Sequence, residues 1–134
     1  MLAEKRYERG ELVILFTQTE REAKMIWRGA SDARDPNAFL EPVFNKVMAD
    51  LDERSLTIDF TDLEFMNSST VSPIISLLKT LDARGIKSRV VFGAEDWQQV
   101  HLRCLRTITR VLKHVQVSGS TPPPSRAPRS GRTG

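Results

Sequence analysis

The first half of the chain alternates apolar and polar residues and then changes to the spacing of a helix. The alternation predicts strands over Leu12–Thr17 and Ala23–Arg28, joined by a hairpin connection at residues 19–22. A loop follows at residues 29–35. Helical spacing then predicts a helix with an inner face of Phe39, Leu40, Val43, Phe44, Val47, Met48 and Leu51.

Two prolines bear on where this helix begins. Asp35-Pro36 is typical of a helix start, with a capping carboxylate ahead of a proline at the first helical position. Pro42 does not fit an uninterrupted helix, because proline lacks the N–H that bonds to the preceding turn. It predicts either a later start, at about Leu40–Glu41, or a kink.

The middle of the chain repeats the order of strand and helix. Leu56–Phe60 is apolar at every second residue and predicts a half-buried strand. Gly85 is the expected residue just after the next helix, and Ser88–Phe92 predicts a short buried strand. The inner face of the helix between them is Val71, Ile74, Ile75, Leu78 and Leu81.

A last helix and a closing strand complete the predicted order. We expect Asp96 to cap a helix whose inner face is Trp97, Val100, Cys104, Ile108 and Val111. His114–Val117 predicts an edge strand. Alternating strands and helices indicate parallel pairing through right-handed crossovers, here on a sheet that begins with a hairpin. The fold class is therefore α/β.

Length and composition predict one domain and a tail. The 134 residues suffice for one core, and residues 118–134 are rich in Pro, Ser, Gly and Arg, so we expect a domain at 1–117 and a disordered tail at 118–134. No apolar run approaches the roughly 20 residues of a membrane helix. The single cysteine, Cys104, fits a reducing compartment and a small core residue. We therefore expect a cytoplasmic protein without a membrane partner.

The net charge of +3 comes from the tail, which holds Arg126, Arg129 and Arg132 and no acidic residue. The remaining 17 basic residues balance the 17 acidic ones, so global charge does not favour nucleic-acid binding. The last helix carries a basic stripe that fits a solvated face better than a docking face. This stripe is Arg103, Arg106, Arg110 and Lys113.

Hydroxyl residues follow the strand at Leu56–Phe60 and begin the next helix, in the segment Phe65-Met66-Asn67-Ser68-Ser69-Thr70. The first four N–H groups of a helix lack partners within it, and the helix dipole is positive there, so a phosphate would be held well. The simpler interpretation is that Asn, Ser and Thr cap the helix. Both interpretations place residues 67–70 at a helix N-terminus.

This segment, with the order of elements, resembles the switch loop of STAS domains, the family of bacterial anti-sigma-factor antagonists. The resemblance runs roughly from Leu12 to Val117 and is most specific from Leu56 to Gly85. It implies a STAS-like mixed sheet of four to five strands with helices packed against it. It also implies Ser68 as the phosphoacceptor, Ser69 as the alternative, and a partner-binding loop of Met66, Asn67, Ser69, Thr70 and Ser72.

Two residues depart from the family pattern. Asn67 replaces the usual Asp, which keeps the capping geometry and loses a charge. Thr70 replaces the usual Gly and adds bulk where the family presents backbone to a partner. The implied partners are a serine kinase that doubles as a binder, as anti-sigma kinases do, and a PPM-type phosphatase.

A SiaC-type subgroup of this family is similar in further residues. It shows Asn followed by hydroxyl residues, a Gly-x-Ser loop as in Gly29-Ala30-Ser31, and a Pro and an Asn as in Pro36-Asn37. Its members switch at the residue after the Asn, again Ser68, and when unphosphorylated they bind and activate a diguanylate cyclase. The resemblance thus implies either partner class, or a STAS-like adaptor that is never phosphorylated.

Other candidate sites are weaker. Asp59, Asp62 and Glu64 are interpreted as surface charges near the serines. His101 and Cys104 lie one turn apart, but no second ligand pair accompanies them, so we expect no metal and no cofactor. No Gly-rich phosphate loop, Ser-His-Asp order or HExxH occurs, so the sequence does not predict an enzyme.

Overall fold

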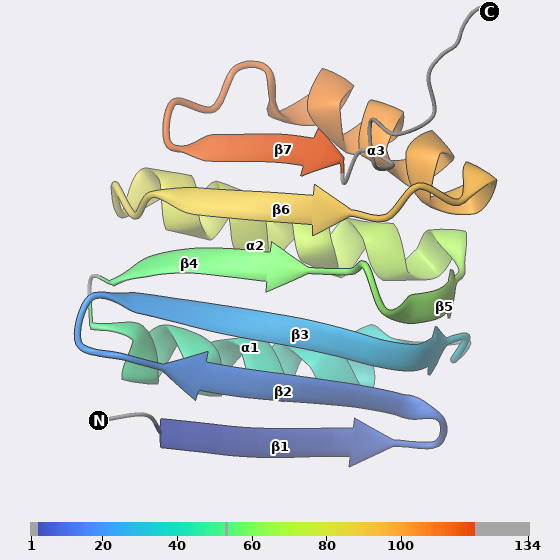
Figure 1. The fold of residues 1–134 in the computed structure, drawn as a ribbon, viewed down its shortest axis with the longest axis horizontal. Coiled ribbons are helices and arrows are strands. Elements are labelled where there is room, and N and C mark those ends of the chain that lie inside the picture. The colour runs from blue at the N-terminus through green and yellow to red at the C-terminus, as the bar shows by residue number, and fades with distance from the viewer. Residues whose placement is uncertain (1–2, 53, 120–134) are drawn as a thin grey trace, which may run out of the picture.

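A seven-stranded sheet with helices behind one face forms the computed structural model, which describes residues 3–52 and 54–119 (Figure 1). A short 3-10 turn at Ser68–Thr70 leads into the second helix. The elements are β1 (Ala3–Arg9), β2 (Leu12–Gln18), β3 (Glu22–Ser31), α1 (Asn37–Leu51), β4 (Ser55–Asp59), β5 (Leu63–Met66), α2 (Val71–Ala83), β6 (Ser88–Phe92), α3 (Asp96–Thr109) and β7 (Val115–Gly119).

The sheet is mixed, as expected. Its strands lie in the order β1-β2-β3-β4-β6-β7, and β5 pairs with the far end of β3. The pairs β1–β2 and β2–β3 are antiparallel, and the others are parallel. The α/β class is confirmed, with more strands than the predicted four to five.

β1 and β5 account for the extra strands. β1 has no apolar alternation: its charged side chains, from Glu4 to Arg9, are exposed along the edge of the sheet. Charged edge strands discourage pairing with other chains. β5 has only four residues and pairs with β3 alone among the described strands. Both strands are defined by their pairing in the sheet, which the local pattern does not show.

The core lies between the sheet and the helices. Trp27 of β3, Phe60 directly after β4 and Phe92 of β6 are all fully buried here. The ring centroids of Trp27 and Phe60 are 5.0 Å apart, as are those of Phe60 and Phe92. Such aromatic pairs add to the free energy gained from burial itself. These rings fix three neighbouring strands relative to one another.

The start of α1 differs from the prediction. The helix begins at Asn37 after Pro36 as the N-cap, and no side chain caps it. Asp35 contributes its backbone carbonyl, which accepts from the N–H of Ala38 at 3.2 Å, so its predicted role as a capping carboxylate was wrong. Pro42 lies inside the helix, which therefore starts before the alternative at Leu40–Glu41.

The end of α2 matches the prediction. Gly85 has φ +72° directly after the helix, the conformation that glycine adopts most readily. The Gly85 N–H donates to the Asp82 carbonyl, and the Ile86 N–H donates to the Leu81 carbonyl, both at 2.9 Å. This pair of bonds is the Schellman motif.

The buried face of α3 was predicted wrongly. Val100, Ile108 and Val111 are exposed, and so is Cys104, which is not a core residue. The helix instead buries Gln98, Leu102, Leu105 and Thr109. Two of these residues are polar, so the apolar pattern indicated the wrong face. The expected cap was also wrong: Glu95 is the N-cap residue without a side-chain bond, and Asp96 lies in the first turn.

β7 pairs in parallel with β6 and extends past the predicted domain end. Ser118 and Gly119, assigned to the tail, lie in this strand. The rest of the predicted tail, 120–134, lies outside the described residues. Just before β7 the His114 N–H donates to Asp82 Oδ1 at 2.7 Å, and this bond lowers the pKa of Asp82 from its ordinary value. No helix in the described ranges is long and apolar enough to cross a membrane.

Candidate functional site

The residues around Ser68 form a junction between two loops that are distant in sequence. One loop leads from β3 to α1, and the other leads from β5 to α2. Ser31, at the end of β3, pairs in register with Met66, and its carbonyl accepts from the Asn67 N–H at 2.9 Å. The sheet thus ends in a fixed crossing of these two loops.

The side chain of Asn67 makes three hydrogen bonds, one of which links the two loops. Its Oδ1 accepts from the Thr70 N–H at 3.1 Å and from Thr70 Oγ1 at 2.7 Å, which caps the turn. Its Nδ2 donates to the Ala33 carbonyl at 2.9 Å. The third bond requires an amide, because an ionised carboxylate has no proton to donate. The geometry therefore explains why Asn suits this position.

Thr70 faces the interior. It is fully buried, and its Oγ1 lies 2.7 Å from Ser31 Oγ, which is 3% exposed. Met66 is also buried. The resemblance placed these two residues in the partner-binding loop. Both side chains point into the core and anchor the loop there. The extra bulk of Thr70 relative to glycine is accommodated inside the fold.

Ser68, Ser69 and Ser72 are exposed. Ser68 is the first residue of the 3-10 turn, and its carbonyl accepts from the Val71 N–H where α2 begins. Its hydroxyl makes no hydrogen bond to another residue that the structure describes. The hydroxyl of Ser68 is therefore accessible on a backbone held by its neighbours.

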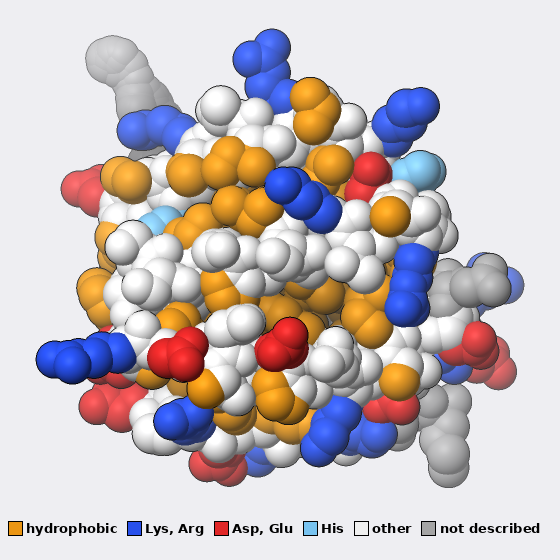
Figure 2. All heavy atoms as spheres, turned by 180° about the vertical axis from the view of Figure 1, so that it is seen from behind, with side chains coloured by type: hydrophobic (Ala, Val, Ile, Leu, Met, Phe, Trp, Pro, Cys, Tyr) orange, Lys and Arg blue, Asp and Glu red, His pale blue; other side chains and the backbone are white. Residues whose placement is uncertain are grey.

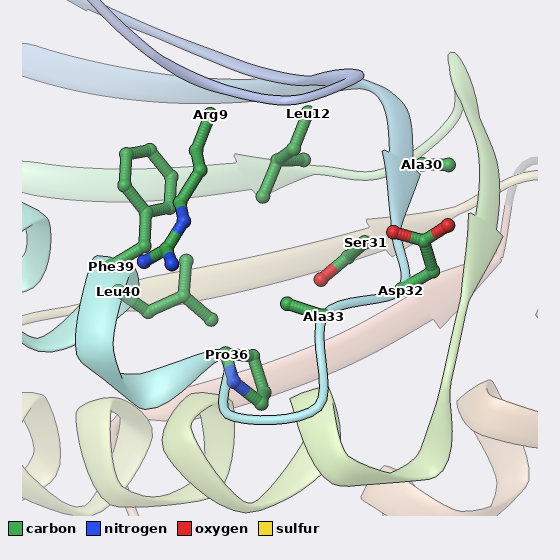
Figure 3. Close-up of a pocket in the computed structure, with 9 residues that line it drawn as sticks. All are labelled: Arg9, Leu12, Ala30, Ser31, Asp32, Ala33, Pro36, Phe39 and Leu40. Carbon is green, nitrogen blue, oxygen red and sulfur yellow. The ribbon is translucent and has the colours of Figure 1, made fainter.

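Two hollows flank this junction. A shallow one of about 250 Å³ is lined on one side by Arg34 and by Asn37 at the start of α1, and on the other side by Ser69 and Ser72. A smaller one, on the other side of the loop, is lined by Arg9, Ser31 and other residues (Figure 3). Its volume of about 30 Å³ has room for one or two water molecules. Only the first hollow is open enough for a side chain of another protein.

Of the acidic residues near the serines, Asp62 and Glu64 lie at the surface, as interpreted, and Asp59 is half-buried. Asp59 is held at the end of β4: its Oδ1 accepts from the N–H and the hydroxyl of Thr61, at 2.8 and 2.6 Å. Asp62 is exposed and lies 3.8 Å from Arg28, and Glu64 is exposed. No group of three or more potential metal ligands is present in the described ranges.

Sequence reasoning singled out the loop residues but missed the partner of Thr70. Ser31 was quoted only as part of Gly29-Ala30-Ser31. Gly29 has φ +84°, and a Cβ built on it would lie 1.8 Å from the Glu11 carbonyl oxygen. A glycine two residues before a serine at a strand end was the available signal, and the structure shows that it lets β2 and β3 approach closely.

We expect Asn67→Asp to lower the free energy of unfolding by about 2 kcal/mol at neutral pH, because a partly buried hydrogen bond is lost and a carboxylate oxygen faces the Ala33 carbonyl. The loss should shrink in acid, since the protonated form can donate to that carbonyl. Urea denaturation over a pH series measures both effects. Asn45→Asp, on the exposed face of α1, is the control and should change stability by less than about 0.5 kcal/mol. Equal effects of the two variants would contradict the assigned bond.

Comparison with known proteins shows similarity in fold and none in sequence-based searches. No protein-family model matches the chain, and no curated protein matches it significantly. The crystal structure of apo-SiaC from Pseudomonas aeruginosa is similar with a TM-score of 0.63 and 13% identity, covering 88% of this chain and 99% of that one. The complex of the diguanylate cyclase SiaD with its activator SiaC, from the same organism, matches with a TM-score of 0.61 and 12% identity, covering 87% of this chain and 99% of that one. At such identity the likeness establishes a shared fold, which the SiaC-type resemblance implied.

Proposed function

We propose that this chain is a phosphorylation-controlled protein-binding module of the STAS-like, SiaC-type class. Ser68 is the proposed phosphoacceptor and Ser69 the alternative. The observation that carries the proposal is the exposed Ser68 hydroxyl on a loop held by the buried contacts of Asn67 and Thr70. Such a loop presents one shape to a kinase, to a phosphatase and to a binding partner.

A phosphate on Ser68 would act through charge. It adds about −1.5 to −2 charges and three acceptor oxygens at neutral pH. The start of α2 accommodates it, because the helix dipole is positive there. A partner that docks on the loop would meet this charge next to Phe65, which is 47% exposed and suits a buried anchor. A micromolar complex has about 8 kcal/mol in total, so a penalty of a few kcal/mol is enough to release it.

The proposed partners follow from the resemblance and the fold. A serine kinase that also binds and a PPM-type phosphatase would set the state of Ser68. The shared fold with SiaC, seen in complex with a diguanylate cyclase as its activator, favours a diguanylate cyclase as the output partner. The hydroxyl has no hydrogen-bonded base in the described part of the chain, so we propose a substrate of regulators and not an enzyme.

An unphosphorylated STAS-like adaptor is the second candidate. The observation that favours it is that capping accounts for the loop: Asn67 and Thr70 make the bonds that a helix start needs. In this case the exposed serines are contact residues. The two candidates differ in whether phosphate is ever found at residues 68–72.

We expect Ser68→Asp to weaken partner binding at least tenfold and Ser68→Ala to leave it intact. Ser68→Ala serves as bait in host lysate, and calorimetry with the recovered, purified partner then compares both variants. Asn45→Asp, which adds the same charge on α1, should bind like the unmodified protein. Tandem mass spectrometry of the protein from its host should find phosphate on Ser68. Equal affinities of the two Ser68 variants, with no phosphate at residues 68–72 under any growth condition, would leave only the adaptor.

A further inference from the structure

A stripe of apolar side chains along α3 and the turn that follows it is exposed. Trp97 is half-buried, and Val100, Ile108 and Val111 are 59%, 38% and 83% exposed. Three of the four large apolar side chains that are exposed in the described ranges therefore lie here. Figure 2 shows hydrophobic side chains gathered on the helical side of the molecule, toward the end where α3 lies. We call Trp97, Val100, Cys104, Ile108 and Val111 the α3 stripe.

The spacing of the α3 stripe is symmetric. Taking Cys104 as the centre, Val100 and Trp97 lie four and seven residues before it, and Ile108 and Val111 lie four and seven after it. Because a helix turns every 3.6 residues, the four positions within α3 share one face, and Val111 follows in the turn after Thr109, the last residue of the helix. A second copy of the helix, running antiparallel about a two-fold axis at Cys104, would place Val100 against Ile108 and Trp97 against Val111. The stripe is thus complementary to itself.

The charges beside the stripe have the same symmetry. Asp96 begins α3 and Arg110 follows it, and both are exposed on one side of the stripe. Antiparallel packing brings Asp96 of one copy to Arg110 of the other, twice per dimer. In the same register Arg103, the other cation on this side, would lie beside Arg103 of the other copy, next to the two-fold axis. The antiparallel order therefore forms two pairs of opposite charges at the ends of the stripe against one like-charged pair at its centre, and it sets the two helix dipoles antiparallel.

Arg106 does not disturb this arrangement. Its Nε donates to the Val117 carbonyl at 3.1 Å, so its head group is held at the β7 side of the helix. Leu102 and Leu105, on the buried face, stay in the core. The α3 stripe is consequently free of charge along its length, while its flanks carry both signs.

We propose that a second copy of this chain covers the α3 stripe, in a two-fold symmetric dimer with its axis at Cys104. Such an interface is isologous, the commonest kind in soluble oligomers. It lies apart from the Ser68 loop in sequence and uses none of its residues. The dimer would present two Ser68 loops, so its existence does not depend on whether Ser68 is phosphorylated.

Sedimentation velocity of the full chain under reducing conditions tests the dimer. We expect a dimer at tens of micromolar and a monomer for Ile108→Glu, which puts a charge in the middle of the stripe. Phe65→Glu, at the fourth exposed apolar side chain, is the control and should stay dimeric. A monomer at a few hundred micromolar, or a dimer lost in Phe65→Glu and kept in Ile108→Glu, would overturn the proposal.

Charge exchange tests the antiparallel order. Asp96→Arg and Arg110→Asp should each weaken the dimer at least tenfold, and the double variant should restore it because the pairs are re-formed with exchanged partners. If the double variant is weaker than both single variants, the proposed pairing is wrong. Unchanged association in all three variants would equally exclude it.

Cys104 provides a test of the axis. Packed helices lie about 8–10 Å apart with Cα atoms at a radius of about 2.3 Å, which leaves roughly 3–5 Å between Cα atoms that face each other, and the upper part of this range overlaps that of a disulfide. Diamide, which takes up the two protons and two electrons of two thiols, should give a covalent dimer that Cys104→Ser lacks. Cys104→Ser should still be dimeric in sedimentation. Absence of the covalent dimer in a sample shown to be dimeric would place the axis elsewhere.

Discussion

Replacing Gln98 with leucine is expected to lower the free energy of unfolding by about 4 kcal/mol, since each buried polar group left without a partner costs about 1–3 kcal/mol. Gln98 is 1% exposed and lies in the first turn of α3. Its Nε2 donates to the carbonyls of Phe60 and Leu63, each at 3.0 Å, and its Oε1 accepts from the Gly93 N–H. Leucine preserves the volume and the helix propensity, so the loss reports these bonds.

Urea denaturation of both proteins gives the measurement, and Gln99→Leu is the matched control. Gln99 is the next residue, half-buried, with one bond from its Nε2 to the Gly93 carbonyl at 2.8 Å. Its loss should cost about 1 kcal/mol. If Gln98→Leu costs no more than Gln99→Leu, the buried amide does not hold the loops as described.

The hydrogen bonds of Gln98 also affect the position of the candidate site. Phe60 directly follows β4, and Leu63 begins β5, which leads to Asn67. The buried amide therefore fixes the start of the strand that carries the Ser68 loop. We expect the Asn67 amide to exchange its hydrogen faster in Gln98→Leu than in Gln99→Leu.

Gly29→Ala is the second large effect, with an expected loss of about 3 kcal/mol or more, because the backbone must both keep a positive φ and move away from a clash. The new Cβ would lie 1.8 Å from the Glu11 carbonyl oxygen and 2.9 Å from its carbon. Both contacts are with backbone, which has no rotamer to change. The edge where β2 meets β3 would have to separate.

Gly10→Ala separates the cost of a positive φ from the cost of a steric clash. Gly10 also has a positive φ, +60°, but a Cβ there would meet no atom within 4 Å. Its replacement should cost only the left-handed penalty of about 1–2 kcal/mol. Thermal and urea denaturation of the two variants give the comparison. Similar losses at both positions would show that β2 and β3 have room to part at Gly29.

The sequence predicted those elements whose apolar residues recur at the spacing of a strand or a helix. β2, β3, β4 and β6, the three helices and the end of α2 at Gly85 follow from apolar spacing and turn chemistry. β1 could not be predicted, because its charged residues form a strand only by pairing with β2. The face of α3 was predicted wrongly because its core side includes Gln98 and Thr109, whose polar atoms bond to backbone carbonyls. The partner of Thr109 is Leu105 within α3, whereas the burial of Gln98 depends on hydrogen-bond partners outside the helix.

The candidate site was predicted in its residues and not in its contacts. The segment at 67–70 showed a helix start, and the capping role of Asn67 is confirmed. The depth of Thr70 could not be inferred, because Thr is common at exposed helix starts and its partner, Ser31, is 39 residues away. The phosphoacceptor role of Ser68 stays a prediction.

The shape of the Ser68 loop is a property of the completed sheet. β3 is ten residues long, and it pairs first with β4 and then with β5. One strand therefore fixes the positions of both. A synthetic peptide covering residues 63–76 would carry the same serines without Ser31 or Ala33 to shape them. An enzyme that recognises the folded conformation of this loop can therefore distinguish the folded protein from an unfolded nascent chain.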